Sequence, residues 1–287
     1  MSFLTAKSFV FNGINSEDYN VVIAWVDSEP DVSTGGLSRE TQKSTTSKIK
    51  VKDNIYGSDN TEPISFTFSI VRTDGTEITR EESIRINQWL TSSPLPQLLQ
   101  FNDYDSYMLH YYAVCTQIKD VVIGGRLIGK ELTFETNSSF AFAKNISKTF
   151  DVTDTLNFYL NNLSDTYNGI YYPTITIVTK SDSIVIENIT DEKSATFDMT
   201  NIVSDDNGDK ILKLNCSNMT IVDKDGKLVY ANDIGWNTEY KSYVSSTDSY
   251  MNNIYWVRLL KGMNKFKITG SCIFTIECEF PRKAGCL

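Results

Sequence analysis

Few residues in this chain have the types and spacing that catalysis needs. His110 is its one histidine and lies in a tyrosine-rich segment, YMLHYYAVCT. A single imidazole excludes metal sites built from several histidines, and it leaves one candidate general base for a cysteine or serine nucleophile. Cys115 lies five residues further along the same predicted strand, so the two side chains point to opposite faces. This spacing argues against a catalytic pair.

The cysteines follow neither a metal-binding nor a disulfide pattern. No two of them have the Cys-x-x-Cys spacing of zinc sites, and their odd number does not suit a disulfide framework. Cys272 and Cys278 share one predicted strand face with Phe274 and Ile276, which indicates buried thiols. We therefore expect neither a metal nor a cofactor. The five cysteines are Cys115, Cys216, Cys272, Cys278 and Cys286.

The acidic residues are numerous, but none marks a catalytic site. Counting alone does not rule out a carboxylate pair for glycoside hydrolysis, since Asp and Glu total 36. No acid, however, stands in an apolar sequence that would raise its pKa toward a catalytic value. The chain also lacks a Gly-x-Gly-x-x-Gly motif and a P-loop. We expect a protein that is not an enzyme.

Charge and hydropathy exclude further classes. A formal charge of −9 and a pI near 4.8 argue against a nucleic-acid-binding surface, which needs clustered Lys and Arg. No apolar run approaches the ~20 residues that span a bilayer. The start, MSFLTAKSFVFNG, lacks the apolar core and cleavage site of a secretory signal. We expect a chain that folds in a cytoplasm.

Composition and length predict a mainly β protein with two domains. The chain has 287 residues, among them fifteen Tyr and fifteen Phe, and aromatic and β-branched residues favour strands. The sequence turns polar after Thr136, and strand-like alternation restarts at Tyr172. We therefore place the boundary between residues 137 and 150, with one domain at 1–143 and another at 144–287. The last residues, PRKAGCL, either finish the second domain or cross back to the first.

One helix stands out, from Thr79 to Leu90. Thr79 and Glu82 have the spacing of a capping box, and Ile86, Trp89 and Leu90 fall on one apolar stripe. A helix this short is marginal alone, so its neighbours must hold it in place. We expect this helix to anchor the first domain. Ile84 points away from the stripe and is either covered by a second surface or exposed.

The remaining periodic segments read as strands. Residues Ser8 to Ile23 form two short runs around an Asn12-Gly13 turn, and Ile64 to Arg72 alternates clearly. Downstream, short runs separated by turn residues predict an antiparallel sandwich or jelly roll. These runs are Thr174 to Val178, Ser183 to Asn188, Ala195 to Met199, Lys210 to Asn215, Ile221 to Tyr230, Trp256 to Leu260, Lys265 to Thr269 and Ser271 to Phe280.

Two polar segments interrupt the strands. Asp27 to Lys48 has almost no apolar residues and is close to charge balance, which predicts a mobile loop that acts as an interaction arm. Lys48 to Lys52 alternates charged and aliphatic residues, as an edge strand or arm does. Ile234 to Asn253 is polar and aromatic. Its candidate contacts for a sugar or a partner protein are Trp236, Tyr240, Tyr243 and Tyr250.

Both ends of the chain resemble one protein family. The opening SFVFNGINSEDYNVVI is similar to the aromatic-x-Phe-Asn-Gly-x-x-Ser-x-Asp-Tyr start of the distal tail proteins of long-tailed phages of Gram-positive bacteria. The closing RLLKGMNKFKITGSCIFTIECEFPRK resembles that family's Leu-x-x-Gly-x-Asn-x-(apolar)-x-(apolar)-x-Gly end. The matching positions are Leu259 or Leu260, Gly262, Asn264, Phe266, Ile268 and Gly270.

The resemblance implies a fold and a role. The fold is an N-terminal belt domain, with one helix and an extended arm, followed by a C-terminal galectin-like β-sandwich. The implied role is structural, at the virion tail tip. Six belt domains close into a ring between the tail tube protein and the tail-tip hub, or tail-associated lysin, protein. In some phages the outer domains also hold the receptor-binding protein.

Two further expectations follow from the family motif. The turn at Leu260 would join two strands, with Gly262 and Asn264 in left-handed conformations. Galectin-like sandwiches often bind sugars, so the alternative function is a carbohydrate-binding protein involved in adhesion to the host surface.

Overall fold

The chain is mainly β and divides into two compact units. The computed structural model describes residues 6–24, 32–33, 40–44, 54–59, 62–102, 109–166, 168–229 and 255–283. The first unit comprises Met1–Lys144 and Pro281–Leu287, and the second comprises Asn145–Phe280. The predicted mainly β fold class is confirmed. The sequence places the boundary after residue 143, and the structural division falls after Lys144.

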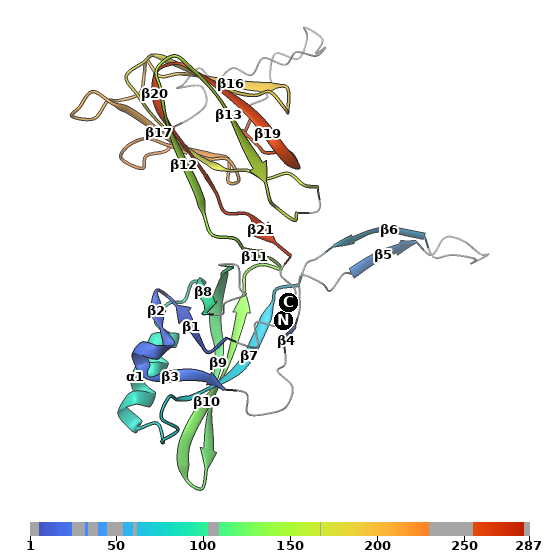
Figure 1. Ribbon diagram of the computed structural model, residues 1–287, viewed down its shortest axis with the longest axis vertical. Coiled ribbons are helices and arrows are strands. Elements are labelled where there is room, and N and C mark those ends of the chain that lie inside the picture. The colour runs from blue at the N-terminus through green and yellow to red at the C-terminus, as the bar shows by residue number, and fades with distance from the viewer. Residues whose placement is uncertain are drawn as a thin grey trace. The chain divides into compact units, whose positions relative to one another are not determined.

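An eight-stranded antiparallel sheet forms most of the first unit (Figure 1). Strand β3 also lies beside the residues that precede β1, because the Ile23 N–H donates to the Lys7 carbonyl at 2.9 Å. The sheet therefore curls until its two sides meet. Its order is β2 (Ile14–Asn15), β1 (Ser8–Phe11), β8 (Gln97–Asn102), β9 (Tyr111–Ile123), β10 (Arg126–Thr136), β7 (Ser65–Arg72) and β3 (Val21–Ala24), with β4 (Val32–Ser33) paired to β7.

Two small sheets complete this unit. Strands β5 (Glu40–Ser44) and β6 (Asn54–Asp59) pair with each other, and β11 (Ala141–Phe142) pairs with β21 (Pro281–Arg282). The end of the chain thus returns to the first unit. The expected strand at Lys48 to Lys52 lies outside the described residues, as does most of the predicted arm from Asp27 to Lys48.

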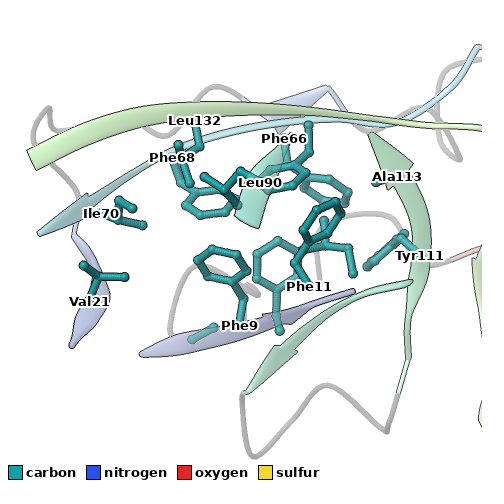
Figure 2. Packing of buried hydrophobic residues seen from close by; sticks show 14 of the residues in the cluster. Phe9, Phe11, Val21, Phe66, Phe68, Ile70, Leu90, Tyr111, Ala113 and Leu132 are labelled. Carbon is teal, nitrogen blue, oxygen red and sulfur yellow. The ribbon is translucent and has the colours of Figure 1, made fainter. Parts of the chain in front are cut away.

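Aromatic side chains from strands far apart in the sequence fill the inside of the curled sheet (Figure 2). Phe68 and Phe134 stack with ring centroids 5.7 Å apart, and Phe66 meets Tyr111 edge-on at 4.8 Å. Alternation along each strand produces this core, because residues two apart share a face. Such pairs add to the free energy gained by burial itself.

The helix α1 (Arg80–Leu90) covers this core. Thr79 is its N-cap, and the capping box with Glu82 is present. Ile86, Trp89 and Leu90 are buried, whereas Ile84 is 49% exposed. Of the two alternatives for Ile84, exposure is therefore correct.

Trp89 connects the helix to two other elements. Its indole stacks on Tyr19, from the 3-10 helix η2 (Ser16–Tyr19), with centroids 4.8 Å apart, and on Phe9 at 5.5 Å. Its Nε1–H donates to the Phe11 carbonyl at 3.0 Å. One side chain therefore joins the helix to both β1 and η2.

The second unit is a sandwich of two antiparallel sheets. Phe158 joins them, because it stacks on Phe266 of its own sheet at 5.2 Å and on Phe150 of the other at 4.6 Å. One sheet has the order β12 (Ile146–Val152), β20 (Cys272–Cys278), β14 (Thr174–Thr179), β17 (Lys210–Asn215) and β18 (Thr220–Val222). The other has the order β13 (Thr155–Asn162), β19 (Gly262–Thr269), β15 (Ser183–Asn188) and β16 (Lys193–Asp198).

Three details of the sequence prediction are wrong here. The segment expected to be turn-rich up to Tyr172 contains β12 and β13. In β12 the exposed Lys148 interrupts the apolar stripe of the strand. In β13 the apolar residues alternate with Asn157 and Asn161, and asparagine is also a common turn residue. Residues Trp256 to Leu260 form a single bridge, Leu259 with Tyr171, and not a strand. The strand expected at Ile221 ends at Val222.

We predict that Trp89→Ala lowers the free energy of unfolding of the first unit by about 3 to 5 kcal/mol, since it removes a large buried ring. Thr79→Ala removes one capping bond and should lower it by only about 1 kcal/mol. Ile84→Ala, on the exposed face of the same helix, is the matched control. Urea titration of the full chain, followed by circular dichroism, measures all three. Equal and small effects of the first two changes would contradict the anchoring role of the helix.

Candidate functional site

The candidate catalytic residues lie in structural positions. The backbone N–H and C=O of His110 both bond to Phe142, at 2.9 and 2.8 Å, and its ring packs against those of Tyr112 and Phe142. Burial raises the pKa of the Cys115 thiol to about 11, and its Sγ donates to the Gln117 carbonyl at 3.6 Å. A thiol with that pKa stays protonated at neutral pH and is a poor nucleophile.

The other described cysteines are also buried and protonated. Burial raises the pKa of Cys272 to about 11 and the pKa values of Cys216 and Cys278 to about 12. Cys272 and Cys278 are 5% and 1% exposed, as the strand pattern predicts. In the described part of the chain, no group of three or more His, Cys, Asp or Glu could hold a metal ion. Within the same residues, no helix is long and apolar enough to span a membrane.

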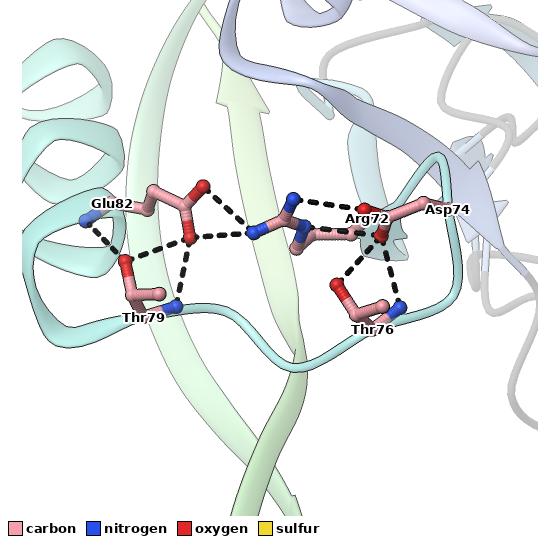
Figure 3. Close-up of polar contacts among 5 residues, drawn as sticks. All are labelled: Arg72, Asp74, Thr76, Thr79 and Glu82. Atoms are coloured by element: carbon pink, nitrogen blue, oxygen red, sulfur yellow. Dashed lines mark hydrogen bonds and ion pairs between the residues drawn. The ribbon is translucent and has the colours of Figure 1, made fainter.

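A polar network holds the start of the helix against β7 (Figure 3). Arg72 donates to both Glu82 oxygens, at 2.8 and 3.0 Å, and to Asp74 at 2.9 and 3.1 Å. The Thr76 N–H and hydroxyl, followed by Arg72, lower the pKa of Asp74 to about 2. The Thr79 N–H and hydroxyl, followed by Arg72, lower the pKa of Glu82. Both carboxylates are therefore charged at neutral pH and fix the loop that leads into the helix.

The hairpin of β9 and β10 extends beyond the strands that flank it. Strand β8 pairs only with residues 111–113 of β9, and β7 pairs only with 129–135 of β10, so the hairpin extends beyond both (Figure 1). Over residues 114–123, β9 pairs with β10 on one side and with no described strand on the other. At its tip, Val122 and Ile123 are 58% and 61% exposed.

The hairpin is stiffened along its length. Lys119 and Glu131 pair at 2.7 Å on one face. On the other face, Lys130 is fully buried and its Nζ meets Asp120 at 2.5 Å. Gly129 lies so close to β7 that a Cβ there would come 2.5 Å from the Ile70 carbonyl oxygen. These contacts present the edge and the tip as a preformed surface.

In the second unit, three buried asparagines hold the segment that precedes β19. The Nδ2 groups of Asn188, Asn162 and Asn264 donate to three consecutive carbonyls, those of Arg258 (2.8 Å), Leu259 (3.1 Å) and Leu260 (2.7 Å). The Asn264 Oδ1 also accepts from the Leu260 N–H at 2.8 Å. Side-chain amides, together with the backbone bridge of Leu259 to Tyr171, thus take the place of a neighbouring strand for residues 258–260.

This arrangement explains the family motif at the turn. Gly262 has φ +85° and Gly270 has φ +113°, where a Cβ would come 2.7 Å from the Ser183 carbonyl oxygen. Asn264 lies in β19 and is absent from the residues with positive φ, so its expected left-handed conformation is wrong. Its role is to bond the backbone of Leu260.

An ion pair lies beside this segment. Arg258 donates two bonds to Asp191, at 2.8 and 3.0 Å, and the Asp191 side chain is 6% exposed. The hydrogen bond to Asp191 raises the pKa of Arg258 further above its ordinary value. The expected aromatic contacts Trp236, Tyr240, Tyr243 and Tyr250 lie outside the described residues.

We predict that Asn264→Leu lowers the free energy of unfolding of the second unit by at least about 3 kcal/mol, because it leaves buried backbone groups of Leu260 and Gly262 without partners. Asn157→Leu changes an exposed asparagine of the same unit. It should change the free energy of unfolding by no more than about 0.5 kcal/mol. Differential scanning calorimetry of the full chain compares the two. Equal effects would mean that the amide bonds contribute nothing specific.

Comparisons with known proteins agree with this architecture. Residues 4–138 match a family model described as a phage tail protein N-terminal domain. The fold matches the SPP1 Dit (gp 19.1) protein, described as a paradigm of the hub adsorption apparatus in phages that infect Gram-positive bacteria. The TM-score is 0.58 and the identity 13%, over 95% of this chain and 98% of that one.

A second structure, the phage P2 baseplate in its activated conformation with Ca, matches with a TM-score of 0.51 and 10% identity over 99% of this chain and all of that one. No curated protein matches in sequence. At these identities the structures show the fold, and the match to the family model covers residues 4–138. Residues 4–138 are therefore similar to the N-terminal domain of a phage tail protein, and the chain has the fold of the SPP1 Dit protein.

Proposed function

We propose that this chain is a ring-forming structural component of the tip of a long non-contractile tail, and that six copies close through the first unit. The observation that carries the proposal is the β9–β10 hairpin, with its open edge at residues 114–123 and its apolar tip. The family match over residues 4–138 supports a tail role for this same unit.

The open edge calls for a partner strand. A long edge with free N–H and C=O groups aggregates unless something covers it. This edge holds the segment TQIKDVVI, which is rich in β-branched residues and carries two opposite charges. In a closed ring each copy offers one surface and receives a different one, so every hairpin is covered and no surface is left over.

The apolar tip adds to the contact. Val122 and Ile123 lie next to the Gly124-Gly125 turn, whose φ values are +58° and +80°. Exposed aliphatic side chains at the end of a stiff hairpin are suited to insert against a neighbouring copy. Burial of these side chains and strand pairing would both stabilise the contact between neighbouring copies.

The remaining partners belong to the same proposal. The ring would join the tail tube protein to the tail-tip hub protein, also called the tail-associated lysin, and the second unit would face outward and dock the receptor-binding protein where one is present. The chain itself would act without catalysis, through contacts alone. The fold likeness to the SPP1 Dit protein supports this place in the tail.

The test is the solution mass of the full chain by light scattering, together with negative-stain images. We expect rings of six at concentrations well above micromolar, where a contact of about −8 kcal/mol is half saturated. The double change Val122→Lys and Ile123→Lys should shift the mass to that of the monomer and leave the circular dichroism spectrum that of the folded chain.

The matched control is Met219→Lys with Val203→Lys, two residues of the second unit that are 61% and 70% exposed. This variant should still form rings. A wild-type chain that stays monomeric at about 100 times that concentration, or a hairpin variant that assembles normally, would refute the role given to the hairpin.

A further inference from the structure

The outer face of β13 and β19 in the second unit combines groups that bind sugars. The two strands lie side by side (Figure 1), and their register places three pairs across from each other. The intervening residues, such as Phe158 and Phe266, are buried, so the residues of these pairs point outward. The pairs are Asn157 with Lys267, Tyr159 with Lys265, and Asn161 with Met263.

Tyr159 stands at the centre of this face. It is 57% exposed and belongs to no aromatic pair among the described residues. Pyranose rings pack their C–H groups on the flat face of an aromatic ring. A solvent-exposed tyrosine offers such an apolar face, with a hydroxyl at its edge. An exposed ring on a rigid strand therefore supplies a stacking platform without any loop having to order.

Amide side chains flank the ring on both sides. Asn157 and Asn161 lie two residues before and after Tyr159 on the same face, and both are exposed. Each carboxamide carries two donors and an acceptor, the combination that matches sugar hydroxyls. From Asn157 to Asn161 the strand rises about 13 Å, enough for a short oligosaccharide to lie along it.

The charge on this face selects among sugars. Lys265 lies directly across from Tyr159 and makes no ion pair within the described residues. Its backbone N–H donates to the Thr190 hydroxyl at 2.9 Å, which fixes this stretch of β19. Lys267 has Glu187 across from it on the other side. Lys265 is therefore the cation left to bind an outside anion, on a chain whose formal charge is −9.

We propose that this face binds a sugar chain that carries an acidic group, with a sugar ring on Tyr159, its hydroxyls on Asn157 and Asn161, and the phosphate or carboxylate on Lys265. The proposal concerns the second unit alone and does not depend on ring formation. It also does not involve the aromatic residues at 236–250.

Calorimetric titration of the full chain at low salt tests this with two matched pairs of probes. Phosphomannan is compared with the same mannan after its phosphates are removed, and oligogalacturonate with its methyl ester. We expect at least one acidic probe to bind about tenfold more tightly than its neutral partner, and to weaken as salt screens Lys265. The pair that shows the difference tells phosphate from carboxylate.

Variants assign the contacts. Tyr159→Ala and Lys265→Gln should each weaken binding about tenfold, whereas Tyr159→Phe, which keeps the ring, should retain most of it. Lys213→Gln is the control, since Lys213 is an exposed lysine of the opposite sheet. None of the three positions is buried, so all four variants should fold.

Three results would overturn the proposal. The first is that neither acidic probe binds the wild-type chain. The second is that inorganic polyphosphate binds as well as the sugar chains, which would reduce the face to a cationic patch. The third is that Tyr159→Ala leaves the affinity unchanged.

Discussion

The first unit depends on the packing of one indole. Trp89 lies between the rings of Tyr19 and Phe9 and bonds to the Phe11 carbonyl, so a helix from the middle of the chain is held by its first twenty residues. A helix of eleven residues has little stability of its own and takes it from such contacts. The curled sheet in turn needs the helix, because its aromatic core would otherwise face water.

This constraint extends to the surface that the proposed ring would use. The loop from Arg72 to Thr79 leads from β7 into the helix, and the Ile78 N–H donates to the Leu127 carbonyl of β10 at 2.7 Å. The segment that the Arg72 network orders therefore holds the hairpin close to its turn, since Leu127 lies two residues after Gly125. A hairpin that is held close to its turn keeps one direction, which a symmetric assembly requires.

In the second unit, stability depends on hydrogen bonds to a segment that belongs to no sheet. Residues 258–260 run beside the sandwich without joining a sheet, and backbone groups buried in this way must find partners. Three asparagine side chains supply them, on three successive carbonyls. Two of these asparagines, Asn162 and Asn264, belong to β13 and β19. The buried amides therefore also hold the backbone that presents Tyr159 on the outer face of these strands.

Local pattern predicted the parts whose signals are local. The capping box at Thr79, the stripe of Ile86, Trp89 and Leu90, and the left-handed turn at Asn12-Gly13 are all present, because each depends on residues within one or two turns of chain. The same holds for β15 and β17, whose predicted bounds match. Strand β12 was missed because Lys148 interrupts its apolar stripe, and β13 because its asparagines are also typical of turns. The asparagine cluster was missed because its members lie far apart in the sequence.

The sequence by itself therefore determined the β class, the helix at Arg80–Leu90 with its cap, the buried thiols of Cys272 and Cys278 and the family resemblance of both ends. Only the tertiary structure decided which strands are neighbours, that β3 returns to β1, that β9 keeps an open edge, and that Asn264 bonds to Leu260 and does not itself turn the chain. The physical reason is the range of the interactions. Caps and periodicity depend on residues a few positions apart. Strand pairing and buried amide bonds join residues far apart in the sequence, and no local pattern indicates that these residues are in contact.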